Sequence, residues 1–260
     1  MLLRRITEHV KAQNWLAVGI DFLIVVIGVF VGLQVSNWND ARSLNSKSAL
    51  FTERLKSDLR YEAWNYQYLI EYFDDVQTSG YRALNALTGN TQLSDEALLI
   101  NAYRATQYLV NYRSRSTFDE LTSTGALDLI HDENLRNTAL WVYNTPVFED
   151  TALGSDSMQY RELFRMLVPL EVQDALLEKC GDPVVEAGDF ESIIDSLDYP
   201  CETGLPSELL AEVANTLHTE TSMVSLLRLR IANVKTYSTY LTLFNLDSRF
   251  SLQTIAEEKP

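Results

Sequence analysis

The chain carries one long apolar run near its start, from Trp15 to Val35, with the sequence WLAVGIDFLIVVIGVFVGLQV and a single charged residue, Asp21. As a helix this run would rise about 31 Å at ~1.5 Å per residue, enough to cross the hydrocarbon core of a bilayer. Trp15 and Trp38 bracket it, as aromatic side chains do at membrane–water interfaces. The run predicts a transmembrane helix over residues 15–37, after a short basic tail over residues 1–14.

A cleaved signal peptide is the alternative explanation for such a run. Signal peptides have a basic start, a shorter apolar region and small residues at the cleavage site. Arg4, Arg5 and Lys11 supply the basic start, which an anchor shares. The apolar run is too long for a signal peptide, however, and it ends in residues 33–38, LQVSNW, without an A-x-A pattern. We therefore expect an uncleaved anchor.

The polar and small residues of the predicted span fall on one helical stripe. At ~100° per residue, Gly28 and Gly32 lie within about 20° of Asp21, and Ala17 lies within about 40°. Gly28 and Gly32 also have the G-x-x-x-G spacing that lets two helices approach closely in lipid. A carboxyl group facing lipid would be costly, so we expect Asp21 to face another helix, a water-filled gap or the interface. The stripe predicts an association face; alternatively, Asp21 reaches the headgroups and the glycines are incidental.

Residues 25–28 (VVIG) and 33–40 (LQVSNWND) resemble the signature V-V-x-G-x-x-x-A-L-Q-x-N-N-W-N-E of a bacterial domain-of-unknown-function family of single-span membrane proteins. Residues 117–130, followed by 134–136 and 143–144, are similar to a second motif of that family. An acidic residue also stands there at the place of Asp21. The resemblance implies an N-terminal anchor with an extramembrane body, and it implies no activity. The chain departs from the signature at Gly32, Ser36 and Asp40, where the family has Ala, Asn and Glu.

A second resemblance concerns three residues of the span. Trp15, Asp21 and Phe22 are similar to the start of the rod subunit of ion-driven flagellar stators. That similarity implies that Asp21 carries a transported ion. The body shows no evident peptidoglycan-binding pattern, which such a subunit would have.

The acidity of the chain belongs to its body. The net charge is −15; residues 1–45 hold four Lys or Arg against three Asp or Glu, and the remainder holds 17 against 33. Such a surface disfavours nucleic acid and anionic lipid headgroups as partners. Arg4, Arg5 and Lys11 precede the span, but Arg42, Lys47 and Arg54 follow it and blunt the positive-inside bias; a short basic tail inside and a long acidic domain outside is still the favoured arrangement. We expect a bacterial inner-membrane protein with a cytoplasmic N-terminus and a periplasmic C-terminal domain.

The two cysteines, Cys180 and Cys201, lie in the most irregular stretch of the sequence, residues 180–206. A disulfide between them would suit an oxidising compartment such as the periplasm. The alternative is a pair of ordinary buried thiols. Their spacing is no metal-binding motif.

Residues 38–260 predict an all-α domain, a helical bundle outside the membrane. Residues 37–47 either continue the span helix or form a neck. A long C-terminal helix is expected to pack antiparallel on the helix that begins at Ser48, and residues 254–260 are expected to be disordered. The predicted helices are Ser48 to Val76, Ser94 (as N-cap) to about Val110, a short helix with a Thr117–Glu120 capping box ending near Gly125, a helix capped by Asp132 and stopped at Thr145–Pro146, Met158 to Glu178, and Leu210 to Phe244.

No pattern of catalytic or metal-binding residues stands out. The three histidines are His9, His131 and His218, and His131 precedes two acids whose expected role is to cap a helix. No zinc-binding pair, phosphate-binding glycine loop or nucleophile motif occurs. Aromatic residues gather between Tyr61 and Tyr72; we interpret them as a half-buried flank of the bundle rather than a binding surface. The sequence predicts no enzyme activity, no metal and no cofactor.

The expected function is that of a structural or accessory subunit of a membrane complex. Its partners would be the lipid bilayer and either further copies of itself or other membrane proteins, joined through the span. The first alternative is an ion-coupled motor or transporter component that uses Asp21. The second is a periplasmic ligand sensor, which would need a separate output partner because the N-terminal tail is too short to hold an output domain.

Overall fold

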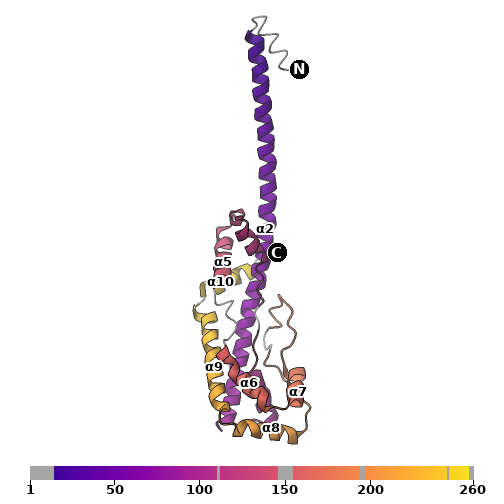
Figure 1. Ribbon diagram of the computed structural model, residues 1–260, viewed down its shortest axis with the longest axis vertical. Helices are drawn as coiled ribbons and strands as arrows, with labels where there is room; N and C mark the ends of the chain where they lie inside the picture. The colour runs from indigo at the N-terminus through magenta and orange to yellow at the C-terminus, as the bar shows by residue number, and fades with distance from the viewer. Residues whose placement is uncertain (1–14, 110–111, 146–154, 194–196, 245, 258–260) are drawn as a thin grey trace. The chain divides into compact units, whose positions relative to one another are not determined.

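The structure is a computed structural model that describes residues 15–109, 112–145, 155–193, 197–244 and 246–257 (Figure 1). Within these ranges the chain forms helices and no strand, which confirms the all-α prediction. The chain divides into two compact units. The N-terminal unit comprises Met1–Glu53 with Asp128–His131, and the main unit comprises Arg54–Leu127 with Asp132–Pro260.

Helix α2, Trp15–Leu87, is 73 residues long and belongs to both units. Residues 37–47 are helical, so of the two alternatives for this stretch the continued helix is correct and the neck is wrong. The reason is local, because that stretch contains no proline or glycine to interrupt the helix. The helix ends at the predicted break, where the Thr88 amide still donates to the Leu84 carbonyl at 3.0 Å and a turn follows.

The apolar part of α2 is covered by no other described residue. Of the helices in the described ranges, α2 alone is long and apolar enough to cross a membrane, and none of its most apolar window is buried. A signal sequence near the N-terminus is also a long apolar helix, so length and composition alone do not separate it from a membrane span. Further along the N-terminal unit, the Ser48 hydroxyl donates to the carbonyl of Leu129 at 2.5 Å, and Leu129 is the last residue of the 3₁₀ turn η1, Leu127–Leu129.

In the main unit, the second half of α2 packs against α9, Met223–Thr239, and the π-helical turn η3, Tyr240–Phe244, that follows it (Figure 1). Residue numbers rise along α2 as they fall along the partner, so the two helices are antiparallel, as the sequence predicts. The contacts that show this are the Tyr66 hydroxyl with the Leu241 carbonyl, the Phe73 ring 4.9 Å from the Tyr237 ring, and the backbone of Gly80 against Ile231.

Four shorter helices complete the core of the main unit. They are α3, Asp95–Arg104; α6, Ser155–Leu167; α7, Leu170–Cys180; and α8, Ser207–Thr219. Helix α3 packs against α7 and α8, and α6 packs against α8 and α9. Leu99, Tyr160, Phe164 and Leu176 of these helices are buried in one apolar cluster with Leu227 of α9.

The expected extent of α3 is wrong at its C-terminal end. Ser94 caps the helix as predicted, with its hydroxyl accepting from the Ala97 amide, but the helix ends at Arg104 rather than near Val110. The carbonyls that follow accept side-chain donors from other helices instead of continuing the helical ladder. Arg230 of α9 donates to the Ala105 and Gln107 carbonyls at 3.1 and 2.5 Å.

Two predicted long helices are each interrupted. The helix expected from Met158 to Glu178 breaks between α6 and α7 because Pro169 has no amide to donate and disfavours helical backbone at Val168. The helix expected from Leu210 to Phe244 breaks between Thr219 and Met223, where the Glu220 side chain accepts from the Ser222 amide at 2.9 Å. At this second break a side-chain carboxylate thus accepts an amide hydrogen bond in place of a helical carbonyl.

The C-terminal stretch is helical rather than disordered. Helix α10, Leu246–Glu257, includes most of the residues expected to be a free end, while residues 258–260 lie outside the described ranges. Leu252 and Ile255 are buried, so the helix has an apolar face that packs. It packs on α5, Glu133–Asn144.

Helix α4, Ser116–Ser123, starts differently from the prediction. Thr117 lies inside the helix and is buried, so the expected capping box is wrong. The Thr117 amide donates instead to the Asp58 carboxylate of α2, at 3.2 Å. Gly125, at φ 68°, ends the helix as predicted, and the Ala126 amide closes it on the Leu121 carbonyl at 2.8 Å.

Candidate functional site

The predicted association stripe is an open surface of the N-terminal unit. A Cβ atom built on Gly28 or Gly32 would meet no other atom within 4 Å. Asp21 is half-buried, and its Oδ2 atom is covered yet makes no hydrogen bond to the described part of the chain. The side chain of Ala17 lies outside what the structure describes. The stripe therefore has room for a second helix, and its association role stays a prediction.

The two tryptophans that bracket the apolar run are both exposed. Trp15 is 75% exposed and Trp38 is 66% exposed. The Arg42 guanidinium lies 5.9 Å from the Trp38 ring centroid, within cation–π range. An indole beside a cation is an arrangement suited to a headgroup layer, and the interfacial role of both residues stays a prediction.

Cys180 and Cys201 form a disulfide, with their Cα atoms 5.5 Å apart. Cys180 is the last residue of α7 and is fully buried. Arg104 of α3 lies beside the bond: its Nη2 donates to the Tyr199 carbonyl at 2.7 Å and lies 3.5 Å from the Cys201 sulfur. The pairing predicted from the sequence is confirmed, and the alternative of two buried thiols is wrong.

The irregular segment between the cysteines is fastened to α2 by hydrogen bonds to carboxylates. The Tyr72 hydroxyl donates to Asp182 at 2.9 Å, and Arg82 donates to both carboxylate oxygens of Asp198 at 2.6 and 2.9 Å. Desolvation raises the pKa of Asp182 above its ordinary range and outweighs the Tyr72 hydrogen bond. The hydrogen bonds from Arg82 lower the pKa of Asp198.

A buried ion pair joins α2 to the segment before α4. Glu62 is 1% exposed and accepts from Arg113 Nε at 2.7 Å and from the Ser114 amide at 2.6 Å. Desolvation raises the pKa of Glu62, and Arg113 offsets this only in part. The sequence analysis missed the pair, although an acid in step with Leu59 and Tyr66 on the apolar face of α2 was a usable signal.

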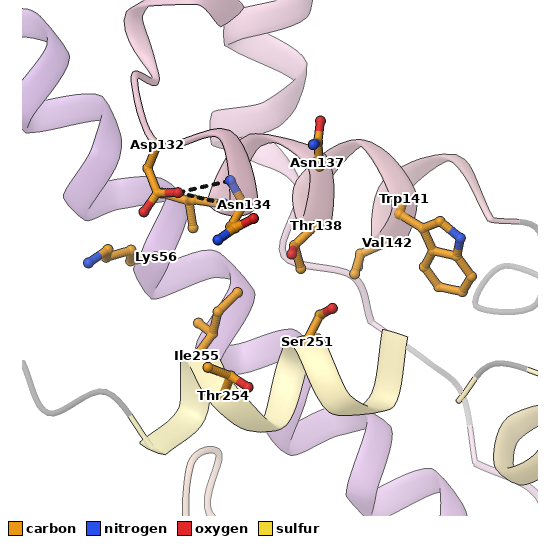
Figure 2. A pocket seen from close by; sticks show the side chains of 11 residues that line it. Lys56, Asp132, Asn134, Asn137, Thr138, Trp141, Val142, Ser251, Thr254 and Ile255 are labelled. Carbon is orange, nitrogen blue, oxygen red and sulfur yellow. Dashed lines mark hydrogen bonds between the residues drawn. The ribbon is translucent and has the colours of Figure 1, made fainter. Parts of the chain in front are cut away.

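A hollow of about 460 Å³ lies in the main unit between α5, α10 and the α2 residue Lys56. Figure 2 shows the side chains of Asn134 and Thr138 on α5 and of Ser251 on α10 directed toward the space between these two helices. The lining residues are Lys56, Asp132, Asn134, Leu135, Asn137, Thr138, Trp141, Val142, Ser251, Thr254 and Ile255. The sequence analysis missed this hollow because it predicted no helix at α10.

The polar groups of this hollow are organised by the helix starts and turns around it. The Asp132 carboxylate caps α5, accepting from the Asn134 and Leu135 amides at 2.9 and 3.1 Å, as the sequence predicts. The Thr254 hydroxyl donates to the Phe250 carbonyl at 2.9 Å, so its lone pairs remain acceptors. Leu135, Val142 and Ile255 are buried and form an apolar floor.

The aromatic residues of α2 and the histidines are the other residues that the sequence analysis singled out. The aromatic group on α2 is part of the core rather than a half-buried flank; Trp64, Tyr66, Tyr68 and Tyr72 are all buried. His131 Nδ1 lies 3.4 Å from the Ser48 hydroxyl, while His218 is exposed and His9 lies outside the described residues. Among the residues that the structure describes, no group of three His, Cys, Asp or Glu is placed to hold a metal ion.

No family model, curated protein or solved structure matches this chain. The family resemblance of residues 25–40 and 117–144 stays a prediction.

Proposed function

We propose that this chain is a single-pass protein of a bacterial inner membrane, with a cytoplasmic N-terminus and a helical periplasmic domain, and that it serves as a structural or accessory subunit of a membrane complex. One observation carries the proposal: the apolar stretch of α2 is covered by no other described residue. Exposing apolar surface to water costs roughly 25 cal/mol per Å². A bilayer removes that cost along the whole stretch.

The side of the membrane is supported by two features. The Cys180–Cys201 disulfide suits an oxidising compartment, and disulfides are rare in the bacterial cytoplasm. Arg4, Arg5 and Lys11 precede the apolar run, as expected for a segment retained on the cytoplasmic side. Together they favour the main unit in the periplasm.

Association through α2 is supported by the open surface at Gly28 and Gly32. Helices in lipid associate by close backbone approach at small residues and by hydrogen bonds between polar side chains. Asp21 supplies such a polar side chain on the same stripe, and contact with a second helix would shield its carboxyl group from lipid. The stripe thus fits a contact between two span helices.

Crosslinking in native membranes tests this contact. We expect Gly28→Ile and Gly32→Ile each to reduce the yield of crosslinked oligomer, because the larger side chain keeps the helices apart. Gly19→Ile is the matched control: Gly19 is equally open, and at ~100° per residue it lies about 160° around the helix from Asp21. Equal yields from all three variants and the wild type would remove the association face.

An ion-coupled role is the second candidate, favoured by the covered Asp21 Oδ2 atom that has no hydrogen bond to the described part of the chain. A carboxyl group in such a place is able to carry a proton. The two candidates differ in the effect of Asp21→Asn. The ion-coupled role requires Asp21→Asn to keep its crosslinking yield and to lose proton flux in proteoliposomes. The structural role predicts no proton flux in the wild type or in the variant.

A further inference from the structure

We propose that the hollow between α5 and α10 binds a neutral, hydroxyl-rich ligand of the saccharide class. The inference concerns the main unit alone and does not depend on association through α2. It follows from the size of the hollow, the polar groups on its walls, the balance of its charges and its apolar floor.

The size of the hollow is that of a small-molecule site. Its volume of about 460 Å³ falls within the range of roughly 300–1,000 Å³ that is common for ligand pockets. Three elements far apart in the sequence form it, since Lys56 comes from α2, Thr138 from α5 and Ser251 from α10 (Figure 2). A short oligosaccharide fits a space of this kind.

The walls carry groups that both donate and accept hydrogen bonds. Amides such as Asn134 and hydroxyls such as Thr138 and Ser251 have both capacities. The Thr254 hydroxyl, whose hydrogen is used by the Phe250 carbonyl, offers acceptor sites. Ligand hydroxyls match such a surface because each of them also donates and accepts. A purely apolar ligand would dehydrate the Asn134 amide and the Thr138 hydroxyl without replacing their hydrogen bonds to water, which is costly.

The charges around the hollow favour a neutral ligand. The lining holds one cationic side chain, Lys56, and one anionic side chain, Asp132. The Asp132 carboxylate already accepts two amide hydrogen bonds, so it offers little to a cation. An anion would meet a chain whose net charge is −15. Phosphorylated and carboxylated ligands are therefore disfavoured.

The apolar parts of the lining fit the C–H faces of sugar rings. Leu135, Val142 and Ile255 form the buried floor. Trp141 stands at one end of the hollow in Figure 2 and is 37% exposed, which leaves part of its indole ring available for contact. An aromatic side chain combines a large apolar face with a polar edge, as a sugar ring does.

Titration calorimetry of the full chain in lipid nanodiscs tests the proposal. The probes are three neutral trisaccharides, tri-N-acetylchitotriose, cellotriose and maltotriose, with inorganic phosphate as the anionic comparison and toluene as the neutral apolar comparison. Titrations into empty nanodiscs are subtracted as the blank. We expect at least one trisaccharide to bind and both comparisons to fail. Binding of none of the three sugars, or tighter binding of phosphate or toluene, would overturn the proposal.

A pair of threonine variants assigns the binding to this hollow. Thr254→Val removes a wall hydroxyl and should weaken the trisaccharide that binds by about threefold to tenfold, the size of one hydrogen bond. Thr236→Val on α9 is the matched control, because its exposed hydroxyl donates to the Ala232 carbonyl in the same i−4 manner, at 3.0 Å. Equal weakening by both variants would contradict the assignment.

A space-filling variant gives an independent check. Thr138→Phe places a ring in the hollow and should abolish binding of the same trisaccharide. Far-UV circular dichroism and the intact Cys180–Cys201 disulfide would show that the variant has folded. A folded Thr138→Phe protein that binds the sugar as the wild type does would also overturn the proposal.

Discussion

Arg113 and Glu62 form an ion pair in the interior of the main unit, with 2.7 Å between Arg113 Nε and a Glu62 carboxylate oxygen. Both side chains are nine-tenths or more buried, and Arg113 also donates to the Val142 carbonyl of α5 at 3.0 Å. The pair therefore connects α2, the segment before α4, and α5. Removal of one partner leaves the other charge uncompensated in the core.

Glu62→Ala should lower the free energy of unfolding by about 3–5 kcal/mol, the range for breaking a buried ion pair. Glu120→Ala is the control, since Glu120 pairs with Arg54 at 2.9 Å on the surface and such exposed pairs contribute about 0–1 kcal/mol. Urea denaturation of the full chain in detergent measures both. Similar losses in the two variants would show that burial of the Glu62 pair has no energetic weight.

Asp182 and Asp198 of the irregular segment should affect stability with opposite dependence on pH. The pKa of Asp182 is raised in the folded state, so the folded protein holds this proton more tightly than the unfolded chain does. The free energy of unfolding should therefore fall as pH rises from the ordinary carboxyl pKa, near 4, toward the pKa in the folded state. Asp182→Asn should remove that loss. Unfolding free energies measured across this pH range give the comparison, and an unchanged pH profile in Asp182→Asn would contradict the assignment.

Asp198 is the counterpart, because the hydrogen bonds from Arg82 lower its folded-state pKa. The stability that the ionised Asp198 contributes is present above the ordinary carboxyl pKa, and it is lost as pH falls through the pKa of Asp198 in the folded state. Asp198→Asn should therefore destabilise the protein at neutral pH and have less effect in acid. The same denaturation series tests this, and a larger effect in acid than at neutral pH would refute it.

Gly80 lies where α2 and α9 approach closely. A Cβ atom at this position would lie 2.9 Å from Ile231 Cγ1, closer than carbon atoms pack. In Gly80→Ala, overpacking should destabilise the protein by about 1–3 kcal/mol. The higher helix propensity of alanine should offset up to ~1 kcal/mol of that loss. The cost should shrink in an Ile231→Ala background. A double-mutant cycle by thermal unfolding measures this coupling, and additive effects would contradict the close contact.

The Cys180–Cys201 disulfide closes the irregular segment, and its removal should cost about 3 kcal/mol in the chain-entropy description. The variant Cys180→Ser/Cys201→Ser is expected to unfold at lower urea concentration than the oxidised wild type. Reduced wild type serves as the control, because it lacks the bond but keeps both sulfur atoms. If reduction and the double substitution both left the unfolding midpoint unchanged, the disulfide would have no stabilising role.

The features that the sequence predicted correctly depend on short-range signals. Asp132 caps α5, Gly125 ends α4 and the pairing of α2 with α9 follows a regular apolar period. These signals involve either neighbouring residues or one helix face. Whether residues 37–47 continue the span helix or form a neck was left open by the sequence; they are helical, and nothing in their composition interrupts a helix.

The errors arise where a residue distant in sequence decides the local structure, or where a local signal was overlooked. Thr117 does not cap α4 because Asp58 of α2 accepts from its amide. Helix α3 stops early because Arg230 of α9 binds the carbonyls beyond it. Pro169 was a visible local break that the apolar pattern obscured. The hollow depends on α10, which packs on α5 through Ile255 and its neighbours, and no single segment predicts such a site.

We propose that α2 holds the chain in the inner membrane with the main unit in the periplasm. Trypsin treatment of intact spheroplasts, combined with alkaline extraction of their membranes, measures both properties. The full chain should stay in the membrane after alkaline extraction, and external trypsin should cut at exposed sites of the main unit such as Arg228 on α9. Release of the chain into the soluble fraction, or protection of the main unit until the spheroplasts are lysed, would contradict it.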